Sequence, residues 1–574
     1  MDRLLFFARP YTRRFLWGAV LLLLTNATSL AMPQLVRMAI DGLHEGTSMD
    51  FLRDIAVMMV ALAVAGAIFR TLSRVHVFYA ARDVEMDLRC TYFRTLTRLA
   101  PSFMAKQNTG DLMSRATSDL PQIRLMLGPG YLNLVNTVVV FLLAIPAMAS
   151  ISGKLTAISL SLYPLGVLTM RYVGRHLFLR NNKQQKVLGQ LSSFIQEGLG
   201  GSHVIRAFAA EEDQMRAFRD LNERYAAAGI DVAWARSGIF RIMATLANIS
   251  IIFVVFFGAH QVLDEHLTYG ELVAMVEYLA LIAAPTSALG WVLSMWQRSV
   301  SAMARMDEIL LAPIEEGVSG AIDAQAPHIE IRDLTLAFGE REVLQHVNIH
   351  VNVGKTLGIV GPIGSGKTTL VRCLMRMTDV PVGHVFLCGR DVAVCDPRAT
   401  RLMFGYVPQN PGLFSDTLRE NVRFGKPKAD DTAVVSMLQS AAMLRDLEVL
   451  PHGLDTEVGE RGLTLSGGQK QRTAIARALL VDPPILILDD ALSAVDTETE
   501  AEILGKIRSL RRGRTTVIVS HRLSAVQHAD EIIVLEEGRV VQRGTDASLR
   551  AMEGLYAVLA EHQDVTREGT EVHV

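Results

Sequence analysis

The chain has 574 residues, of which 50% are hydrophobic and 20% are charged, and its mean hydropathy is +0.27. These values exclude a purely soluble protein as well as one embedded in a membrane throughout, and they fit about three or four domains of mixed kind. A net charge of −2 argues against nucleic acid as a partner, and four cysteines without CxxC spacing argue against a disulfide framework or a zinc site.

The amino-terminal segment, residues 1–14, mixes four arginines with large apolar side chains. This pattern predicts a short amphipathic elbow helix that lies on the membrane surface. A cleavable signal peptide is excluded because the apolar run that follows is too long for a signal-peptide core.

Six apolar runs of membrane-spanning length follow, all before residue 297. A helix needs roughly 20 residues to cross the bilayer core, so the runs predict a transmembrane domain over residues 15–312 with six helices in a lipid bilayer. Buried helices of a large soluble core are the alternative, which six long runs confined to one half of the chain disfavour. The third and fourth runs need a tight turn near Ser152–Lys154. The predicted spans are Phe15–Ile40, Phe51–Arg74, Gly128–Ser150, Ile151–Val173, Ile239–Val262 and Leu272–Trp296.

The connectors between the spans alternate in length. Residues 70–124 and 171–241 are long and rich in arginine, whereas the other connectors are short. The positive-inside tendency therefore places the long connectors and both termini in the cytoplasm, with the spans in the cell inner membrane. Each long connector is predicted to be helical with a break that forms a short transverse helix, at Asn108–Asp111 followed by Leu112–Asp119, and near Ala209–Arg219. We expect these tips to couple the spans to a cytoplasmic partner; solvated polar helices are the alternative.

The composition changes after the sixth span. Residues 313–327 have the composition of a linker, and residues 328–562 alternate strand-like and helical patterns. This alternation predicts a soluble α/β domain with a mostly parallel sheet. Residues 563–574 form a polar carboxyl-terminal tail.

A phosphate-binding loop opens the chemistry of this domain. Residues 361–368, GPIGSGKT, match the pattern G-x-x-x-x-G-K-[ST], between an apolar strand at Thr356–Val360 and a helix at Thr369–Arg376. The backbone N–H groups of such a loop, together with the helix N-terminus, cradle phosphates. We expect Lys367 to reach the β- and γ-phosphates and Thr368 to hold Mg²⁺. The predicted nucleotide-contacting residues are Gly361, Pro362, Ile363, Gly364, Ser365, Gly366, Lys367, Thr368 and Thr369.

Two further motifs complete the nucleotide chemistry. Ile485–Asp489 is an apolar strand whose terminal carboxylate, Asp489, would emerge beside the Mg²⁺ site; such a strand is common and gains its meaning from the loop before it. Leu465–Gln469, LSGGQ, is a second anion cradle at a helix start, with Ser466, Gly467, Gly468 and Gln469 as its predicted contacts. One domain does not need two cradles for one nucleotide, so two copies facing head to tail would each close over the other's ATP.

With these motifs the chain resembles a half-transporter of the ATP-binding cassette (ABC) exporter family, from the amino-terminal elbow to about Leu559. The resemblance is to multidrug or lipid exporters, in particular to the degenerate-site subunit of bacterial heterodimeric multidrug exporters. It implies a six-span α-helical domain of the type I exporter fold, fused to an α/β P-loop nucleotide-binding domain. It also implies ATP and Mg²⁺ as ligands, a second half-transporter as partner, and a hydrophobic small molecule as substrate.

The resemblance assigns further positions. Phe338 stands where the family stacks an aromatic ring, usually tyrosine, on adenine. Gln409 matches the glutamine that touches Mg²⁺, and His521 matches the histidine that contacts the γ-phosphate, although as an isolated residue His521 would be structural. Thr456–Gly462 matches an exporter-specific loop, and Ser493–Asp496 matches a loop that contacts the other half of the dimer.

Asp490 departs from the family, which has a catalytic glutamate at this position. Aspartate is one methylene shorter, and a misplacement of about 1 Å costs on the order of 10²-fold in rate. Impaired hydrolysis beside an intact signature resembles a heterodimeric exporter with unequal sites, in which Lys367, Asp489 and Asp490 form the slow site. Two alternatives remain: backbone adjustment restores the geometry, or the chain forms a homodimer that is a poor ATPase.

The substrate is weakly encoded. Glu277 lies about two helical turns inside the sixth span, where acidic residues are functional candidates. It could attract cationic substrates, pair with Arg37, or face water near the outer surface. An ATP-gated channel and a non-catalytic nucleotide-binding subunit are the rival functions on the same scaffold.

Overall fold

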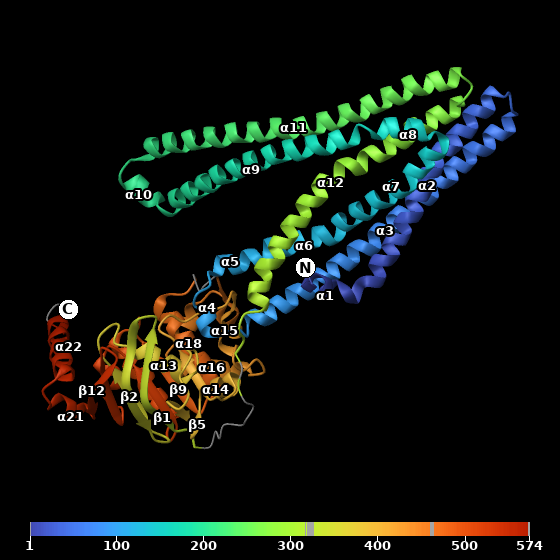
Figure 1. The fold of residues 1–574 in the computed structure, drawn as a ribbon. Helices are drawn as coiled ribbons and strands as arrows, with labels where there is room; N and C mark the ends of the chain where they lie inside the picture. Colours follow the sequence, from blue (N-terminus) through green and yellow to red (C-terminus); the bar gives the residue numbers. More distant parts are fainter. Residues whose placement is uncertain (1, 316, 318–325, 460–463, 572–574) are drawn as a thin grey trace. The chain divides into compact units, whose positions relative to one another are not determined.

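The computed structural model describes residues 2–315, 317, 326–459 and 464–571. The chain divides into two compact units, which are described separately (Figure 1). The first unit comprises Met1–Thr97 and Asn108–Ala312, and the second comprises Arg98–Gln107 and Pro313–Val574. Residues 316 and 318–325 of the predicted linker lie outside the described part of the chain.

The first unit is entirely helical where it is described. Two of its short elements, η2 and η3, are π-helical turns inside one continuous helix that runs from Thr109 to Ile151. The elements are α1 (Asp2–Ala8), η1 (Arg9–Tyr11), α2 (Thr12–His44), α3 (Met49–Leu96), α5 (Thr109–Ser114), η2 (Arg115–Asp119), α6 (Leu120–Leu125), η3 (Met126–Gly130), α7 (Tyr131–Ile151), α8 (Gly153–Leu160), α9 (Tyr163–Gly200), α10 (Ser202–Ala207), α11 (Glu211–Leu263) and α12 (Tyr269–Leu310).

Four helices in the described part of the chain are long and apolar enough to cross a membrane: Arg3–His44, Met49–Leu96, Thr109–Ile151 and Tyr269–Leu310. They contain the first, second, third and sixth predicted spans. The predicted fourth and fifth spans lie on α8–α9 and on α11, whose apolar stretch within the described residues is shorter, at Asn248–Leu263. The helices make this a multi-pass membrane protein.

The predicted turn between the third and fourth spans consists of a single extended residue. Ser152 ends α7 with φ −155° and ψ 109° and also caps α8, because its side chain accepts a hydrogen bond from Leu155 N at 3.4 Å.

Helix α2, which contains the first predicted span, continues through Pro33 to His44. Asp41 there accepts hydrogen bonds from Thr268 Oγ1 and Gly270 N, both at 2.9 Å, and so anchors the start of α12.

The first predicted transverse helix is not a separate element, because its residues begin the continuous helix Thr109–Ile151. Asn108 caps this helix, with its Oδ1 accepting from Gly110 N at 2.9 Å, and the separate short helix before it is α4 (Pro101–Met104). The second was placed wrongly. The short helix is α10, which joins the side-by-side helices α9 and α11 (Figure 1), whereas the predicted segment begins α11. The double glycine Gly200–Gly201 ends α9, and Ala209, with φ +50°, makes the second bend. The acidic residues that follow lie in the first turn of α11, where negative charge stabilises the start of a helix.

The second unit is an α/β domain with two larger sheets and one short antiparallel pair, β7–β8. The larger sheets have the orders β2-β1-β4-β5 and β12-β11-β3-β10-β9-β6. In the six-stranded sheet β11, β3, β10, β9 and β6 are parallel, and β12 is an antiparallel edge strand. The strands are β1 (Ile329–Phe338), β2 (Arg341–Val351), β3 (Thr356–Val360), β4 (Val385–Leu387), β5 (Arg390–Asp391), β6 (Phe404–Val407), β7 (Asp416–Thr417), β8 (Glu457–Val458), β9 (Ile485–Asp489), β10 (Thr515–Val519), β11 (Glu531–Glu536) and β12 (Arg539–Gly544).

Helices cover the parallel sheet, and its central strands are fully buried, as in β9. Because parallel strands end at the same edge of a sheet, β3, β9 and β10 bring their carboxyl ends together there. Helix α22 runs into the segment predicted to be a polar tail, of which residues 572–574 lie outside the description. The helices are α4 (Pro101–Met104), α13 (Lys367–Leu374), α14 (Pro397–Leu402), α15 (Leu418–Arg423), α16 (Asp431–Ser440), α17 (Leu444–Val449), η4 (Gly453–Asp455), α18 (Gly467–Val481), α19 (Thr497–Leu510), α20 (Leu523–Val526), α21 (Asp546–Arg550) and α22 (Leu555–Glu571).

Candidate functional site

The phosphate-binding loop between β3 and α13 depends on glycine at two positions. Gly361 has φ +151°, and a Cβ atom there would lie 2.0 Å from the carbonyl oxygen of Leu535. Gly366 caps α13 with φ +101°, and a Cβ atom there would lie 2.8 Å from Val343 O. Larger residues would therefore force the loop away from the neighbouring strands.

Lys367 is held inside the loop. Its Nζ donates to Gly361 O at 2.8 Å and to Pro362 O at 2.7 Å. Burial lowers the pKa of Lys367, and the nearby carboxylates of Asp490 and Asp489 oppose this shift. The ammonium group of Lys367 and the backbone N–H groups of the loop therefore lie close together, and this arrangement suits the binding of a polyphosphate.

Asp489 ends β9 and is 1% exposed. Its Oδ1 accepts from Thr368 Oγ1 at 3.1 Å, and its Oδ2 accepts from Tyr406 OH at 3.0 Å. Burial raises the pKa of Asp489, while the two hydroxyl donors oppose this shift. Burial likewise raises the pKa of Tyr406, so its hydroxyl keeps its proton and stays a donor. The paired oxygens of Asp489 and Thr368 are the hard ligands that Mg²⁺ prefers.

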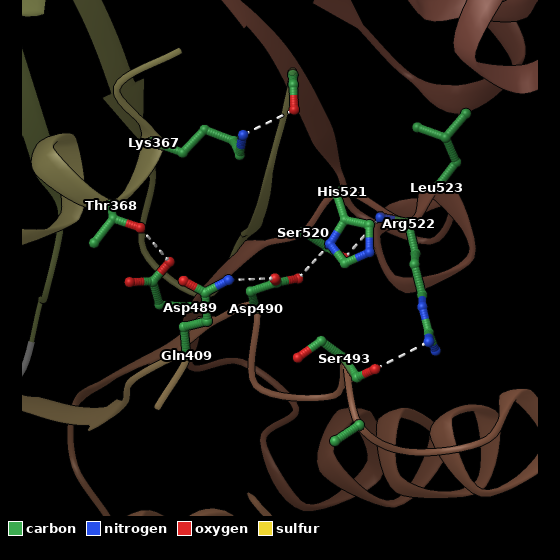
Figure 2. A network of polar contacts seen from close by, with 12 residues as sticks. Lys367, Thr368, Gln409, Asp489, Asp490, Ser493, Ser520, His521, Arg522 and Leu523 are labelled. Atoms are coloured by element: carbon green, nitrogen blue, oxygen red, sulfur yellow. Dashed lines mark hydrogen bonds and ion pairs between the residues drawn. The ribbon is translucent and has the colours of Figure 1, made fainter. Parts of the chain in front are cut away.

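Asp490 connects three segments. Its backbone has φ +50°, and its N–H donates to Val519 O at 2.8 Å. Its Oδ1 accepts from His521 Nδ1 at 2.8 Å, and its Oδ2 accepts from Gln409 Nε2 at 3.0 Å (Figure 2). The structure thus gathers the four predicted residues Gln409, Asp489, Asp490 and His521 at the carboxyl edge of the parallel sheet, next to the loop that carries Lys367 and Thr368.

Arg522, next to His521, was not recognised in the sequence. Its guanidinium donates to the main-chain oxygens of Ser493 at 3.1 Å and Val495 at 3.0 Å, and it pairs with Glu500 at 2.8 Å. Glu500 is 1% exposed. The hydrogen bonds to Ser493 and Val495 therefore hold the predicted dimer-contact loop, Ser493–Asp496, against the segment that carries His521, and Figure 2 shows the contact between Arg522 and Ser493. An arginine directly after the candidate histidine is the only signal in the sequence, and it does not reveal the partners.

Gln563, on α22, holds the same segment from its other side. Its Nε2 donates to His521 O at 2.8 Å, and its Oε1 accepts from Leu523 N at 2.9 Å. This residue was predicted to begin a polar tail, and nothing in that polar composition pointed to a contact 42 positions away in the chain.

The signature residues form a second, separate cradle. Ser466 caps α18 in a reciprocal pair with Gln469: Ser466 Oγ accepts from Gln469 N at 3.3 Å, and Gln469 Oε1 accepts from Ser466 N at 3.0 Å. Gln469 Nε2 also donates to Asp446 Oδ1 at 2.9 Å. A hollow of about 320 Å³ lies between Ser466–Gly468 and Ala494–Asp496. In the described parts of the chain, no hydrogen bond or ion pair joins this cradle to the P-loop.

The remaining predicted residues lie apart from the network. Phe338 ends β1 with its ring 54% exposed, and Ile363 projects from the P-loop with 98% of its side chain exposed. An exposed aromatic ring can stack on a flat base, so the stacking of Phe338 on adenine stays a prediction. Glu460–Gly462 of the predicted exporter-specific loop lie outside the described residues.

Comparisons with known proteins cover both units. Residues 15–286 match the family of ABC transporter transmembrane regions, and residues 344–493 match the ABC transporter family. The probable multidrug resistance ABC transporter ATP-binding/permease protein YheI of Bacillus subtilis is 35% identical over 98% of each chain. The multidrug resistance-like ATP-binding protein MdlA of Escherichia coli is 34% identical over 98% of this chain and 96% of its own.

Two other similarities concern lipids and the fold. An ATP-dependent lipid A-core flippase of Syntrophus aciditrophicus is 29% identical over 98% of this chain and 94% of its own. A solved structure of a bacterial Atm1-family ABC exporter with ATP bound superposes with a TM-score of 0.83, at 29% identity, over 96% of this chain and 98% of that one.

Proposed function

Because the chain belongs to the ABC transporter family, as a type I exporter half whose helical transmembrane domain is fused to an ATP-binding domain, we propose that it exports hydrophobic or amphipathic small molecules. Exporters of this family work as dimers in the membrane. The names of the relatives, which refer to multidrug resistance and to a lipid flippase, support drugs or lipids as the substrate class. We place the chain in the cell inner membrane with both termini in the cytoplasm.

The observation that carries the proposal is the network around Asp489 and Asp490. In this proposal the loop that carries Lys367 binds the β- and γ-phosphates, and His521, which is bonded to Asp490, holds the γ-phosphate. Thr368, Asp489 and Gln409 would hold Mg²⁺, which supplies charge neutralisation to the phosphates. Asp490 accepts the proton of the attacking water, and Ser466–Gln469 of the second half-transporter closes the site. The exposed ring of Phe338 stacks on the adenine.

The same network supports unequal sites. Asp490 is bonded to both Gln409 and His521, so its short side chain is held back toward its own segment. The site made of Lys367, Asp489 and Asp490 then hydrolyses slowly, whereas the signature cradle of this chain completes a fast site that uses a glutamate of a different half-transporter. The chain therefore works as part of a heterodimer. A non-catalytic role for its own site, with the partner supplying most hydrolysis, is the limiting case of this arrangement.

Co-purification tests the assembly. The chain, expressed with its natural neighbours and extracted in mild detergent, should be isolated with one different half-transporter in equal amount. Isolation of a homodimer with full ATPase activity would contradict the heterodimer. Vesicles that contain the assembled pair should then accumulate a fluorescent amphipathic substrate in an ATP-dependent, vanadate-sensitive manner. Nucleotide binding without such transport would instead indicate a channel or a regulatory subunit.

A further inference from the structure

One face of α12 is exposed in the first unit and has an unusual composition. Val273, Glu277, Ala280 and Ala284 follow one another at intervals of four, three and four residues, so they share one helix face. Val273, Ala280 and Ala284 are exposed and Glu277 is half-buried. The residues between them are buried or half-buried against the rest of the unit, and Tyr278 is among the fully buried ones.

This face of α12 differs from the exposed aliphatic face of α3 in the same unit, which is suited to contact lipid. On α3, the residues at the corresponding helical spacing are large and aliphatic, and all are more than half exposed: Val57, Val60, Val64 and Ile68. On α12, two alanines and a carboxylate occupy the exposed face. Hydrocarbon is a poor neighbour for a carboxylate, so this face of α12 borders something polar or charged.

Glu277 has no partner among the residues that the structure describes. The expected alternative, Arg37, is taken by Glu271, with NH2 and Oε1 at 2.8 Å, and by Asp41, with Nε and Oδ2 at 3.7 Å. The polar neighbours Gln34 and Tyr278 are bonded to each other at 3.1 Å. Glu277 lies eight residues after Tyr269, about 12 Å along the helix from its outer end. An unpaired carboxylate at this depth is costly unless a cation joins it.

We propose that Glu277 binds the positively charged group of an amphipathic organic cation, while Val273, Ala280 and Ala284 accommodate the apolar part of the same molecule. The inference rests on the proposed export function and specifies its substrate class. Charge complementarity selects the cation, and the short side chains of Ala280 and Ala284 leave space beside the carboxylate. A basic side chain of the second half-transporter and a proton are the competing occupants.

The test compares two probes of similar shape and different charge in the purified, reconstituted transporter with its partner. Tetraphenylphosphonium carries a positive charge, and triphenylphosphine oxide is neutral. Glu277→Gln should raise the tetraphenylphosphonium concentration that half-maximally stimulates the ATPase by at least about tenfold. Stimulation by triphenylphosphine oxide should not change, and Glu277→Asp should retain most of the response to the cation.

Two outcomes overturn the inference. Equal weakening of the responses to both probes, or no weakening of either, would show that Glu277 does not recognise charge. Loss of basal activity and of the assembled dimer in Glu277→Gln, together with recovery in Glu277→Asp, would assign the carboxylate to a basic residue of the partner instead. If the unsubstituted transporter moves and responds to neither probe nor to any other amphipathic compound, the export function itself fails, which is a separate result.

Ala280→Leu provides a steric control on the same face. It adds volume next to Glu277 and leaves every charge in place. We expect it to weaken the responses to the cation and to the neutral probe alike, because both need the space beside the helix. A selective loss of the cation response in Ala280→Leu would contradict the proposal that Glu277 binds the charge while the alanines accommodate the apolar part of the molecule.

Discussion

His521 Nδ1 lies 2.8 Å from Oδ1 of Asp490, so the candidate base and the candidate γ-phosphate ligand are bonded directly to each other. Gln409 occupies the second oxygen of the same carboxylate at 3.0 Å. A side chain held by both neighbours has little freedom to reach outward to a water molecule. The arrangement therefore connects the departure from the family at one position to a specific kinetic consequence.

Asp490→Glu should raise hydrolysis at this site by about 10- to 100-fold, because one added methylene moves the carboxylate by about 1 Å toward the water. The measurement is the ATPase rate of the assembled pair in which the partner's own site has been inactivated. Asp490→Asn is the matched control and should abolish the remaining activity. An unchanged rate in Asp490→Glu would place the base elsewhere.

Tyr406→Phe should weaken the binding of Mg²⁺ at the site, most strongly at low pH. The hydroxyl of Tyr406 donates to Asp489 at 3.0 Å and so lowers the pKa of a carboxyl group that burial raises. Without this donor the pKa of Asp489 rises further, and as the pH falls a larger fraction is protonated and cannot bind a cation. The Mg²⁺ concentration for half-maximal ATPase should increase by about tenfold or more, and more at pH 6 than at pH 8, because a hydrogen bond to a charged group contributes about 1.5–3 kcal/mol.

Tyr556→Phe is the matched control for Tyr406→Phe. Tyr556 is fully buried, whereas Tyr406 is half-buried, and the hydroxyl of Tyr556 donates to Asp546 at 2.6 Å. Its loss should lower the free energy of unfolding without any change in the Mg²⁺ dependence. A similar Mg²⁺ effect in both variants would show that Tyr406 acts only through stability.

The part of the site that could be predicted from the sequence is the part that lies within short segments. The loop Gly361–Thr368 and the signature Ser466–Gln469 carry their chemistry in backbone turns and helix starts, which depend on adjacent residues. The strand that ends at Asp489 is recognisable from its run of apolar residues, and the structure shows that the whole strand is buried. These motifs define the two cradles without knowledge of the fold.

The long-range contacts could not be predicted in this way. Tyr406, Arg522 and Gln563 reach partners 83, 22 and 42 positions away, and their residue types are common on any surface. The position of α10 was missed for a different reason: the break was predicted near Ala209–Arg219, whereas α9 ends at the double glycine Gly200–Gly201 and the acidic residues start α11. Composition alone does not decide between a break and a helix start.

Cys373 should resist alkylation in the folded protein. None of the four cysteines forms a disulfide in the described residues, and Cys373 is fully buried in α13, where burial raises its thiol pKa to about 12. About 10⁻⁴ of it is thiolate at pH 8, so maleimide should modify the exposed Cys90 first. Because the folded state retains the proton, this thiol also makes the protein less stable as the pH rises above about 9 toward 12. Intact-mass analysis of the native protein and of Cys90→Ser checks the order of labelling, and rapid modification of native Cys373 would contradict it.

Arg522 is expected to be a positioning residue for the dimer-contact loop. Arg522→Lys keeps a charge beside Glu500 but loses the planar fork that reaches Ser493 O and Val495 O. We expect the kcat for ATP to fall by about tenfold with KM almost unchanged, because the loop is misplaced while the nucleotide contacts of Lys367 remain. The measurement is steady-state ATPase of the assembled transporter, with thermal unfolding recorded in parallel.

Removing the charges of both Arg522 and Glu500 distinguishes a positioning role of Arg522 from a purely structural one. Replacing Arg522 alone by Gln leaves the carboxylate of Glu500 buried without a positive countercharge, which costs about 3–5 kcal/mol of stability. In the double variant with Glu500→Gln, no charge is buried, so stability should largely recover while kcat stays low. Lys506→Ala, which breaks the surface pair with Glu502 on the same helix, should change neither quantity by more than about 0.5 kcal/mol or twofold. Recovery of kcat together with stability in the double variant would mean that Arg522 serves folding alone.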